Sequence, residues 1–298
     1  MKRGDNPMSI FPTKVLWATD GSEDAELATT TAVGLAKLTA SELHVVHVGP
    51  AVPERFEPTD VEPVRMEQEA RRTLDEQVKK VENLGGAVAQ SHLRMGKAAE
   101  EVVGLAEEIG AGLIAVGSRG RGRIRRALMG SVSDSVVRHA HCPVMVVRWK
   151  PLVFPATILL ATDASQEARV AATTAADLAR RTGSELHLVH VGSLVTHGAG
   201  SGVEVGPLPG VHQGELDRQA QWLLDAEVEQ MKSSGIDVAG AHLRRGRADE
   251  EVIVLAEVTG ADLIAIGSRG RGGVRRALMG SVSDSVVRHA HCPVMVAR

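Results

Sequence analysis

The chain has 298 residues, of which 43% are hydrophobic and 24% charged, and its formal net charge is −3. This composition is typical of a globular protein with a sizeable core, and the length favours two domains. A charge close to zero gives no overall attraction to nucleic acid or to a membrane. Aromatic residues make up only 2% of the chain, which argues against base-stacking platforms for single-stranded nucleic acid.

Two cysteines, Cys142 and Cys292, are too few for a disulfide framework or a cysteine-rich metal site, and they suit a reducing compartment. Residues 1–14 lack the apolar core of a signal peptide, and no run approaches the ~20 apolar residues of a membrane span. We therefore expect a cytoplasmic protein that binds neither nucleic acid nor membrane.

Residues 15–19 form an apolar run that ends in the turn signal Asp20-Gly21-Ser22, which predicts a strand followed by a helix capped by Ser22. Apolar residues recur at helical spacing from Ala25 to Leu35, and again from Ala168 to Leu178. Further along the first half, the sequence predicts strands at 43–48, 87–94, 113–116 and 144–147, and helices at 65–83, 98–109 and 131–139.

Strands that alternate with helices predict an α/β fold with a parallel, doubly wound sheet and helices on both faces. Ligands bind such sheets outside the carboxyl ends of the strands, where the strand order reverses. The candidate segments for that place are Asp20-Gly21-Ser22 after the first strand and residues 117–131 after the fourth.

The second half of the chain repeats the first. The 32-residue segment that begins GSRGRG at Gly117 recurs at Gly267 with three differences, at an offset of 150 residues. Earlier landmarks recur at an offset of 143, so seven residues are inserted in the glycine-rich stretch 192–215. This repeat predicts two domains, 1–149 and 150–298, each able to fold alone.

The segment Gly117-x2-Gly120-x9-Gly130-Ser131 runs from a strand end to a helix start, as an anion site requires. Glycines allow close backbone approach to a ligand, and the unpaired amides of the helix point at the anion. Ser131 is a candidate N-cap, with Asp134 completing a capping box, or a phosphate ligand. Structural glycines with a capping serine are the alternative, since neither G-x4-G-K-[ST] nor G-x-G-x-x-G is complete.

Together, an Asp in an ATD[GA]S turn after the first strand, His-Val closing the second and Gly-x2-Gly-x9-Gly-Ser after the fourth resemble the ATP-binding branch of the universal stress proteins. The resemblance covers nearly the full chain twice, as in tandem members. It implies two tandem Rossmann-like copies of a doubly wound, five-stranded parallel sheet. It also implies that the fifth strands of the two copies pair edge to edge.

The resemblance implies one ATP site in each half, where a Mg ion would bind through the nucleotide. In the first half, Ala18 and Asp20 would flank the adenosine, Val48 would meet the adenine, Val116 and Gly117 would underlie the ribose, and Gly120, Gly130, Ser131 and Val132 would hold the phosphates. The matching residues of the second half are Ala161, Asp163, Val191, Ile266, Gly267, Gly270, Gly280, Ser281 and Val282. Asp20 and Asp163 would approach the Mg ion, or serve only as turn-forming residues.

Other polar residues have competing interpretations. The arginines of the glycine loops suit a solvated face, a phosphate contact or, less well given the charge, nucleic acid; they are Arg119, Arg121, Arg123, Arg125, Arg126, Arg269, Arg271, Arg275 and Arg276. His139-x-His141 and its copy His289-x-His291 suit a helix end better than a metal site. The strand histidines, His44, His47, His187 and His190, and both cysteines are expected in the core.

No residue has a spacing that commits it to activating water for phosphoryl transfer. The sequence therefore favours a nucleotide-binding regulator or sensor in the stress response with slow or absent hydrolysis. An ATPase or nucleotidyl enzyme using the same pocket and a structural module with vestigial sites remain alternatives. We also expect a homodimer and an unidentified regulatory partner. ATP, ADP, AMP and cyclic AMP share the adenosine that most of the motif would contact.

Overall fold

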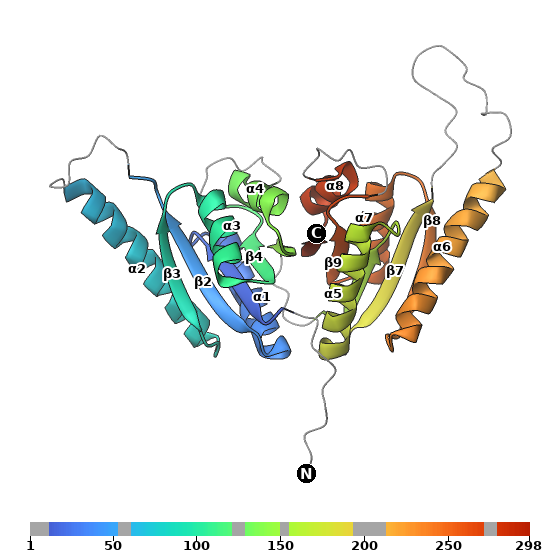
Figure 1. Ribbon diagram of the computed structural model, residues 1–298, viewed down its shortest axis with the longest axis horizontal. Coiled ribbons are helices and arrows are strands. Elements are labelled where there is room, and N and C mark those ends of the chain that lie inside the picture. Colours follow the sequence, from blue (N-terminus) through green and yellow to red (C-terminus); the bar gives the residue numbers. More distant parts are fainter. Residues whose placement is uncertain (1–11, 53–60, 121–128, 150–154, 193–212, 271–278) are drawn as a thin grey trace, which may run out of the picture.

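The computed structural model describes residues 12–52, 61–120, 129–149, 155–192, 213–270 and 279–298. Figure 1 shows two similar α/β halves side by side, with the C-terminus at the junction between them. Their helices and strands follow one another in the same order in each half. The described part of the chain therefore has the α/β architecture that the alternating pattern predicts.

The first half contains β1 (Lys14–Thr19), α1 (Glu23–Thr39), β2 (Glu42–Gly49), α2 (Val61–Asn83), β3 (Gln90–Met95), α3 (Ala98–Ile109), β4 (Leu113–Gly117), α4 (Ser131–His139) and β5 (Val144–Val147). The second half contains β6 (Thr157–Ala161), α5 (Gln166–Thr182), β7 (Glu185–Gly192), α6 (Gln213–Ser233), β8 (Gly240–Arg245), α7 (Ala248–Thr259), β9 (Leu263–Gly267), α8 (Ser281–His289) and β10 (Val294–Ala297).

Two predicted starts differ from the structure by more than one residue. α2 begins at Val61 rather than Arg65, because Pro63 lies in its first turn, where a backbone N–H is not needed for the helical ladder. β3 begins at Gln90 rather than Ala87. The glycine pair before this strand closes α2, as the sequence predicts, since Gly85 has a positive φ of 68° and the Gly86 N–H donates to Val81 O at 2.9 Å.

The two halves share one ten-stranded sheet of order β3-β2-β1-β4-β5-β10-β9-β6-β7-β8. All pairings within a half are parallel, whereas β5 and β10 pair antiparallel, with Met145 opposite Met295. The edge-to-edge pairing expected from the resemblance is thus present. It satisfies the edge hydrogen bonds that an isolated half would expose.

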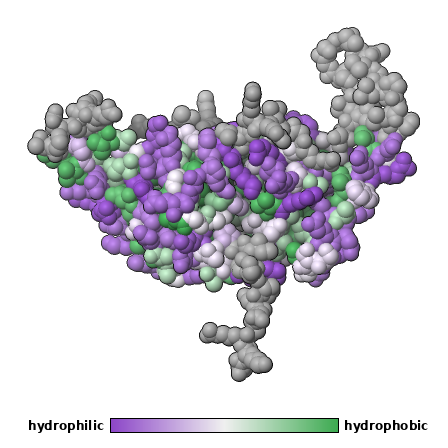
Figure 2. Space-filling view, viewed as in Figure 1, coloured by the Kyte–Doolittle hydropathy of each residue, from purple (hydrophilic) through white to green (hydrophobic). Residues whose placement is uncertain are grey.

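Helices cover both faces of this sheet. α1, α2, α5 and α6 pack on one face, where Ala28, Leu74 and Leu178 are buried with Met145 and Met295 of the junction strands. α3, α4, α7 and α8 pack on the other, around Val136 and Val286. Each apolar core therefore continues from one half into the other, while the visible surface is mostly hydrophilic (Figure 2).

No described helix is both long and apolar enough to cross a membrane.

Candidate functional site

Each half has a crevice at the carboxyl ends of its two central strands. In the first half β1 and β4 are neighbours, but β1 leads into α1 on one face of the sheet and β4 leads toward α4 on the other. The crossovers therefore leave opposite faces at this point, which is where ligands bind in doubly wound sheets. β6 and β9 form the same crevice in the second half.

The turn after β1 is fixed by its own side chains. Asp20 Oδ1 accepts from the Ser22 N–H at 3.0 Å, and Ser22 Oγ accepts from the Ala25 N–H at 3.3 Å, which confirms Ser22 as the N-cap of α1. Gly21 has a positive φ of 73°. In the second half Asp163 and Ser165 make the same bonds, and Ala164 takes the strained conformation at φ 62°.

The glycine loop is attached to this turn. Ser22 Oγ donates to Arg119 O at 3.2 Å, and the Gly130 N–H donates to Ser118 O at 2.8 Å, which closes the loop at its base. A methyl group on Gly120 would overlap Oδ2 of Asp20. Position 120 therefore needs glycine because the backbone crosses directly over the Asp20 carboxylate. Gly270 stands in the same relation to Asp163.

The predicted capping role of Ser131 is wrong. Gly130 has extended torsions, φ −73° and ψ 150°, and its carbonyl accepts the first helical bond from the Asp134 N–H at 2.9 Å, so Gly130 is the N-cap. Asp134 forms no capping box, because its carboxylate is bound by Arg138 and Arg288 instead. The N–H groups of residues 131–133 lie ahead of that first bond and are available to a ligand.

One cavity in each half gathers the predicted site residues. The first encloses about 1,380 Å³ and is lined by all nine residues predicted in that half, Ala18, Asp20, Val48, Val116, Gly117, Gly120, Gly130, Ser131 and Val132. The second encloses about 610 Å³ and is lined by Ala161, Asp163, Val191, Ile266, Gly267, Gly270, Gly280, Ser281 and Val282. Residues spread over more than one hundred positions thus meet at one place in each half.

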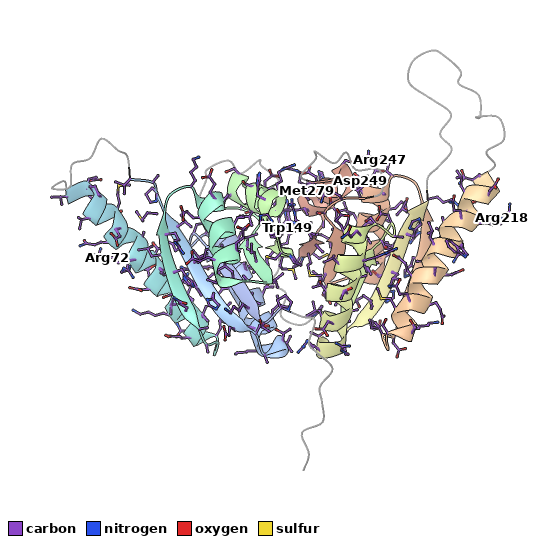
Figure 3. The ribbon with its side chains drawn as sticks, in the orientation of Figure 1. Arg72, Trp149, Arg218, Arg247, Asp249 and Met279 are labelled. Carbon is purple, nitrogen blue, oxygen red and sulfur yellow. The ribbon has the colours of Figure 1, made fainter. Side chains whose placement is uncertain are left out.

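The described loop arginines differ in their partners. Arg119 stacks on Trp149, with Cζ 5.4 Å from the ring centroid, and Arg148 stacks on the same ring at 4.9 Å. Figure 3 shows Trp149 at the junction of the halves. Arg269 instead pairs with Glu167 at 3.0 Å. Arg121, Arg123, Arg125, Arg126, Arg271, Arg275 and Arg276 lie outside the described residues, as does most of the inserted loop.

The strand histidines are hydrogen-bonded, as expected. His47 Nδ1 lies 2.8 Å from Thr19 O, and His190 Nδ1 lies 2.9 Å from Thr162 O. His44 contacts His92, and His187 contacts His242, each at 3.1 Å between ring nitrogens. Burial, reinforced by the neighbouring His44, lowers the pKa of His92.

The histidines that end α4 and α8 and the two cysteines also have local roles. His139 Nδ1 lies 2.7 Å from Ser135 O, a bond within the last turn of α4. Cys292 is buried, and burial raises the pKa of the half-buried Cys142 to about 11. Across the described ranges, no three His, Cys, Asp or Glu side chains are grouped to hold a metal ion.

The hydrogen-bond partner of the threonine that precedes the turn aspartate differs between the two halves. Thr19 Oγ1 lies 3.5 Å from Gln77 Oε1 in the first half, whereas Thr162 Oγ1 donates to Glu227 Oε1 at 2.7 Å in the second. Burial raises the pKa of Glu227. The second half therefore carries a carboxyl group where the first has a neutral amide, and both side chains lie outside the residues that line the cavities.

Sequence reasoning missed several lining residues of the first cavity. Thr19 and His47 line it from the ends of β1 and β2, and Arg288 reaches it from α8 of the other half. His47 directly precedes a predicted site residue, Val48, which is a signal that could have found it. Arg288 carries no such signal, because its place depends on how the halves pack.

Comparison with known proteins agrees with this geometry. The model of the universal stress protein family matches residues 12–148 and 156–298. Universal stress protein Rv2005c of Mycobacterium tuberculosis is 32% identical over 295 residues, which cover 95% of this chain and 96% of that protein. The crystal structure of a universal stress protein from Archaeoglobus fulgidus aligns with a TM-score of 0.73 and 26% identity, over 96% of this chain and 98% of that one.

A universal stress protein solved in complex with cAMP aligns with 46% of this chain and 97% of its own, at 23% identity and a TM-score of 0.38. The two family matches together span almost all of the sequence and coincide with the two halves of the sheet. This chain therefore belongs to the universal stress protein family, as a tandem of two family domains.

Proposed function

We propose that the chain is an ATP-binding regulator with one adenine nucleotide site in each half. One observation carries the proposal: the same nine positions line a cavity at the strand-order reversal of both halves. The presence of a complete glycine loop, turn aspartate and helix start in both halves favours ligand binding over a purely structural module. The domain boundary belongs to the same proposal and lies at Trp149 and Lys150.

The lining suggests how an adenine nucleotide would lie. Ala18 and Val116 line the cavity and would contact the adenosine, and the backbone of Val48 would bond the adenine edge. The N–H groups at the start of α4 would face the phosphates, at the positive end of the helix dipole. Asp20 lies between these two regions and suits a ribose hydroxyl or a phosphate-bound Mg ion.

The proposal includes slow or absent hydrolysis. A general base must be free to reach the attacking water. In the first cavity Asp20 Oδ1 accepts from the Ser22 N–H and His47 Nδ1 is held by Thr19 O, so one atom of each of these candidate bases is already bound. Regulation would then depend on a change of shape or partner on binding rather than on turnover.

Association of two chains remains a prediction. β5 and β10 cover each other's edges within one chain, so a homodimer would use another surface. Light scattering at tens of micromolar tests it, and a strict monomer would contradict it. Cytoplasmic location and a regulatory protein partner belong to the same set of proposals.

Calorimetric titration with MgATP tests the two sites separately. We expect two sites in the unaltered chain, one each in Asp20→Ala and Asp163→Ala, and none in the double variant. Asp75→Ala is the matched control, because it removes an exposed carboxylate from α2, outside both cavities. Unchanged binding in the double variant would refute the proposed role of the aspartates, and no binding in the unaltered chain would refute the function.

A further inference from the structure

Four charged residues link α4 and α8 across the junction of the halves. Arg138 binds Asp134 of its own helix at 2.8 Å, and Arg288 binds Asp284 at 2.8 Å. Each arginine also donates Nη2 across the junction, Arg138 to Asp284 at 2.7 Å and Arg288 to Asp134 at 2.6 Å. We call these four residues the junction ring. It is symmetric in its bonds.

Residues of the junction ring line the first cavity but not the second, among the residues that the structure describes. The first is lined by Ser133, Asp134 and Arg288, so it extends from the start of α4 to a side chain of the second half. The lining of the second includes Ser283 but neither Asp284 nor Arg138 among the described residues. Among the described residues, the junction ring therefore contributes Arg288 and Asp134 to the first cavity and no residue to the second.

Arg288 retains donors for a ligand. Its Nε and Nη2 make all the side-chain hydrogen bonds it forms within the described part of the chain, and Nη1 makes none of them. A guanidinium presents five N–H donors in a planar fork that matches phosphate oxygens. The carboxylate of Asp284 fixes one edge of this fork, so the outer nitrogen is oriented in advance.

The backbone of Arg288 is held as well. Arg148, buried beside Trp149, donates Nη1 to Arg288 O. Trp149 also stacks with Arg119 of the first glycine loop. Contacts from the first half thus hold the end of α8 near Arg119, which lines the first cavity.

We propose that Arg288 is a phosphate-binding residue of the first nucleotide site, so that this site is completed by the other half of the chain. The inference rests on the proposed function and adds a ligand that the repeat does not reveal. Its consequence is a difference between the sites. The first site discriminates between ATP and unphosphorylated adenosine more strongly than the second, because among the described residues the junction ring supplies an arginine to the lining of the first cavity and none to that of the second.

The test uses the full chain with the second site silenced by Asp163→Ala, titrated with MgATP and with adenosine. Adding Arg288→Gln should weaken MgATP binding by about tenfold, the scale of one partly exposed charge-assisted contact, and leave adenosine binding unchanged. Arg288→Lys, which keeps the charge but loses the fork, should weaken it by about threefold.

Arg138→Gln is the matched control. It removes the same number of junction-ring partners and lies on α4 itself, the helix that starts in the first cavity, but it does not line that cavity. If Arg288 only supports the structure, Arg138→Gln should weaken MgATP binding at least as much. We expect a change of no more than about twofold.

The outcomes separate the inference from the function. Equal losses in Arg288→Gln and Arg138→Gln, or equal losses for ATP and adenosine, would overturn the role of Arg288 while leaving nucleotide binding intact. Absence of MgATP binding in the Asp163→Ala chain would overturn both. If circular dichroism shows that Arg288→Gln does not fold, the Arg288→Lys titration decides.

Discussion

Replacing Gly117 with alanine should destabilise the chain by forcing β4 away from the first turn of α1. Gly117 ends β4, where the backbone passes against the first turn of α1. An added Cβ would lie 2.6 Å from the carbonyl carbon of Asp24, 2.7 Å from its oxygen and 2.8 Å from the Ala25 nitrogen. All three are backbone atoms, so no side-chain rotation relieves the overlap, and strand and helix must move apart by roughly 1 Å.

That movement also strains the bond from Ser133 Oγ to Gly117 O, which is 2.7 Å long and ties α4 to the strand. We expect the free energy of unfolding to fall by about 3 kcal/mol, the upper range for overpacking, because backbone opposes the new atom. Urea denaturation followed by circular dichroism measures it, and titration with MgATP should show a weakened first site.

Gly104→Ala is the control. Gly104 lies within α3 with no atom within 4 Å of an added Cβ, so this variant should be more stable by about 0.5–1 kcal/mol through helix propensity. If the free energy of unfolding of Gly117→Ala lies within about 0.5 kcal/mol of the parent value, the packing argument is refuted.

Three further predictions concern titrating groups. Burial raises the pKa of Glu227, so its ionisation favours the unfolded chain and stability is lost as the pH rises through the folded pKa; Glu227→Gln should therefore stabilise more at pH 7.5 than at pH 4, and equal effects in urea titrations would contradict this. Burial, and to a lesser extent a neighbouring histidine, lowers the pKa values of His92 and His242 from 6.5. Stability should therefore fall as the pH drops below about 6.5, and in thermal melts the melting temperature of the His92→Gln/His242→Gln chain should depend less on pH. Because burial raises the pKa of Cys142 to about 11, iodoacetamide at pH 7.5 should modify the native chain far more slowly than free cysteine and should label both cysteines after unfolding; rapid native labelling at Cys142 would be the contrary result.

The sequence predicts much of the site because local patterns determine it. Residues 113–116 and 144–147 are too apolar for anything but buried strands, and the glycine loop can connect strand and helix only at the strand ends. The helix start was misjudged at Ser131 because a glycine with extended torsions precedes it, and a serine there resembles a cap whether or not it acts as one. The predicted start of α2 is too late, because Pro63 fits the first turn of the helix although apolar spacing begins further on. The predicted start of β3 is too early, because the apolar residues that follow the glycine pair precede the strand.

Features that depend on the packing of the halves could not be predicted from local patterns. Asp134 and Arg138 are four residues apart on a helix, a spacing that usually indicates a solvated pair. Only antiparallel pairing of β5 with β10 brings Asp284 and Arg288 against them. The asymmetry of the two cavities is likewise absent from the nearly identical repeats.

If each half holds an adenine nucleotide, the number of nucleotides bound per chain can be counted. Freshly purified protein is denatured, the released small molecules are identified by chromatography and mass, and the remaining capacity is titrated with MgATP. We expect about two adenine nucleotides per chain, released or titrated, in line with the two cavities. No released nucleotide together with no titratable site would contradict it, leaving the glycine loops as structural connections.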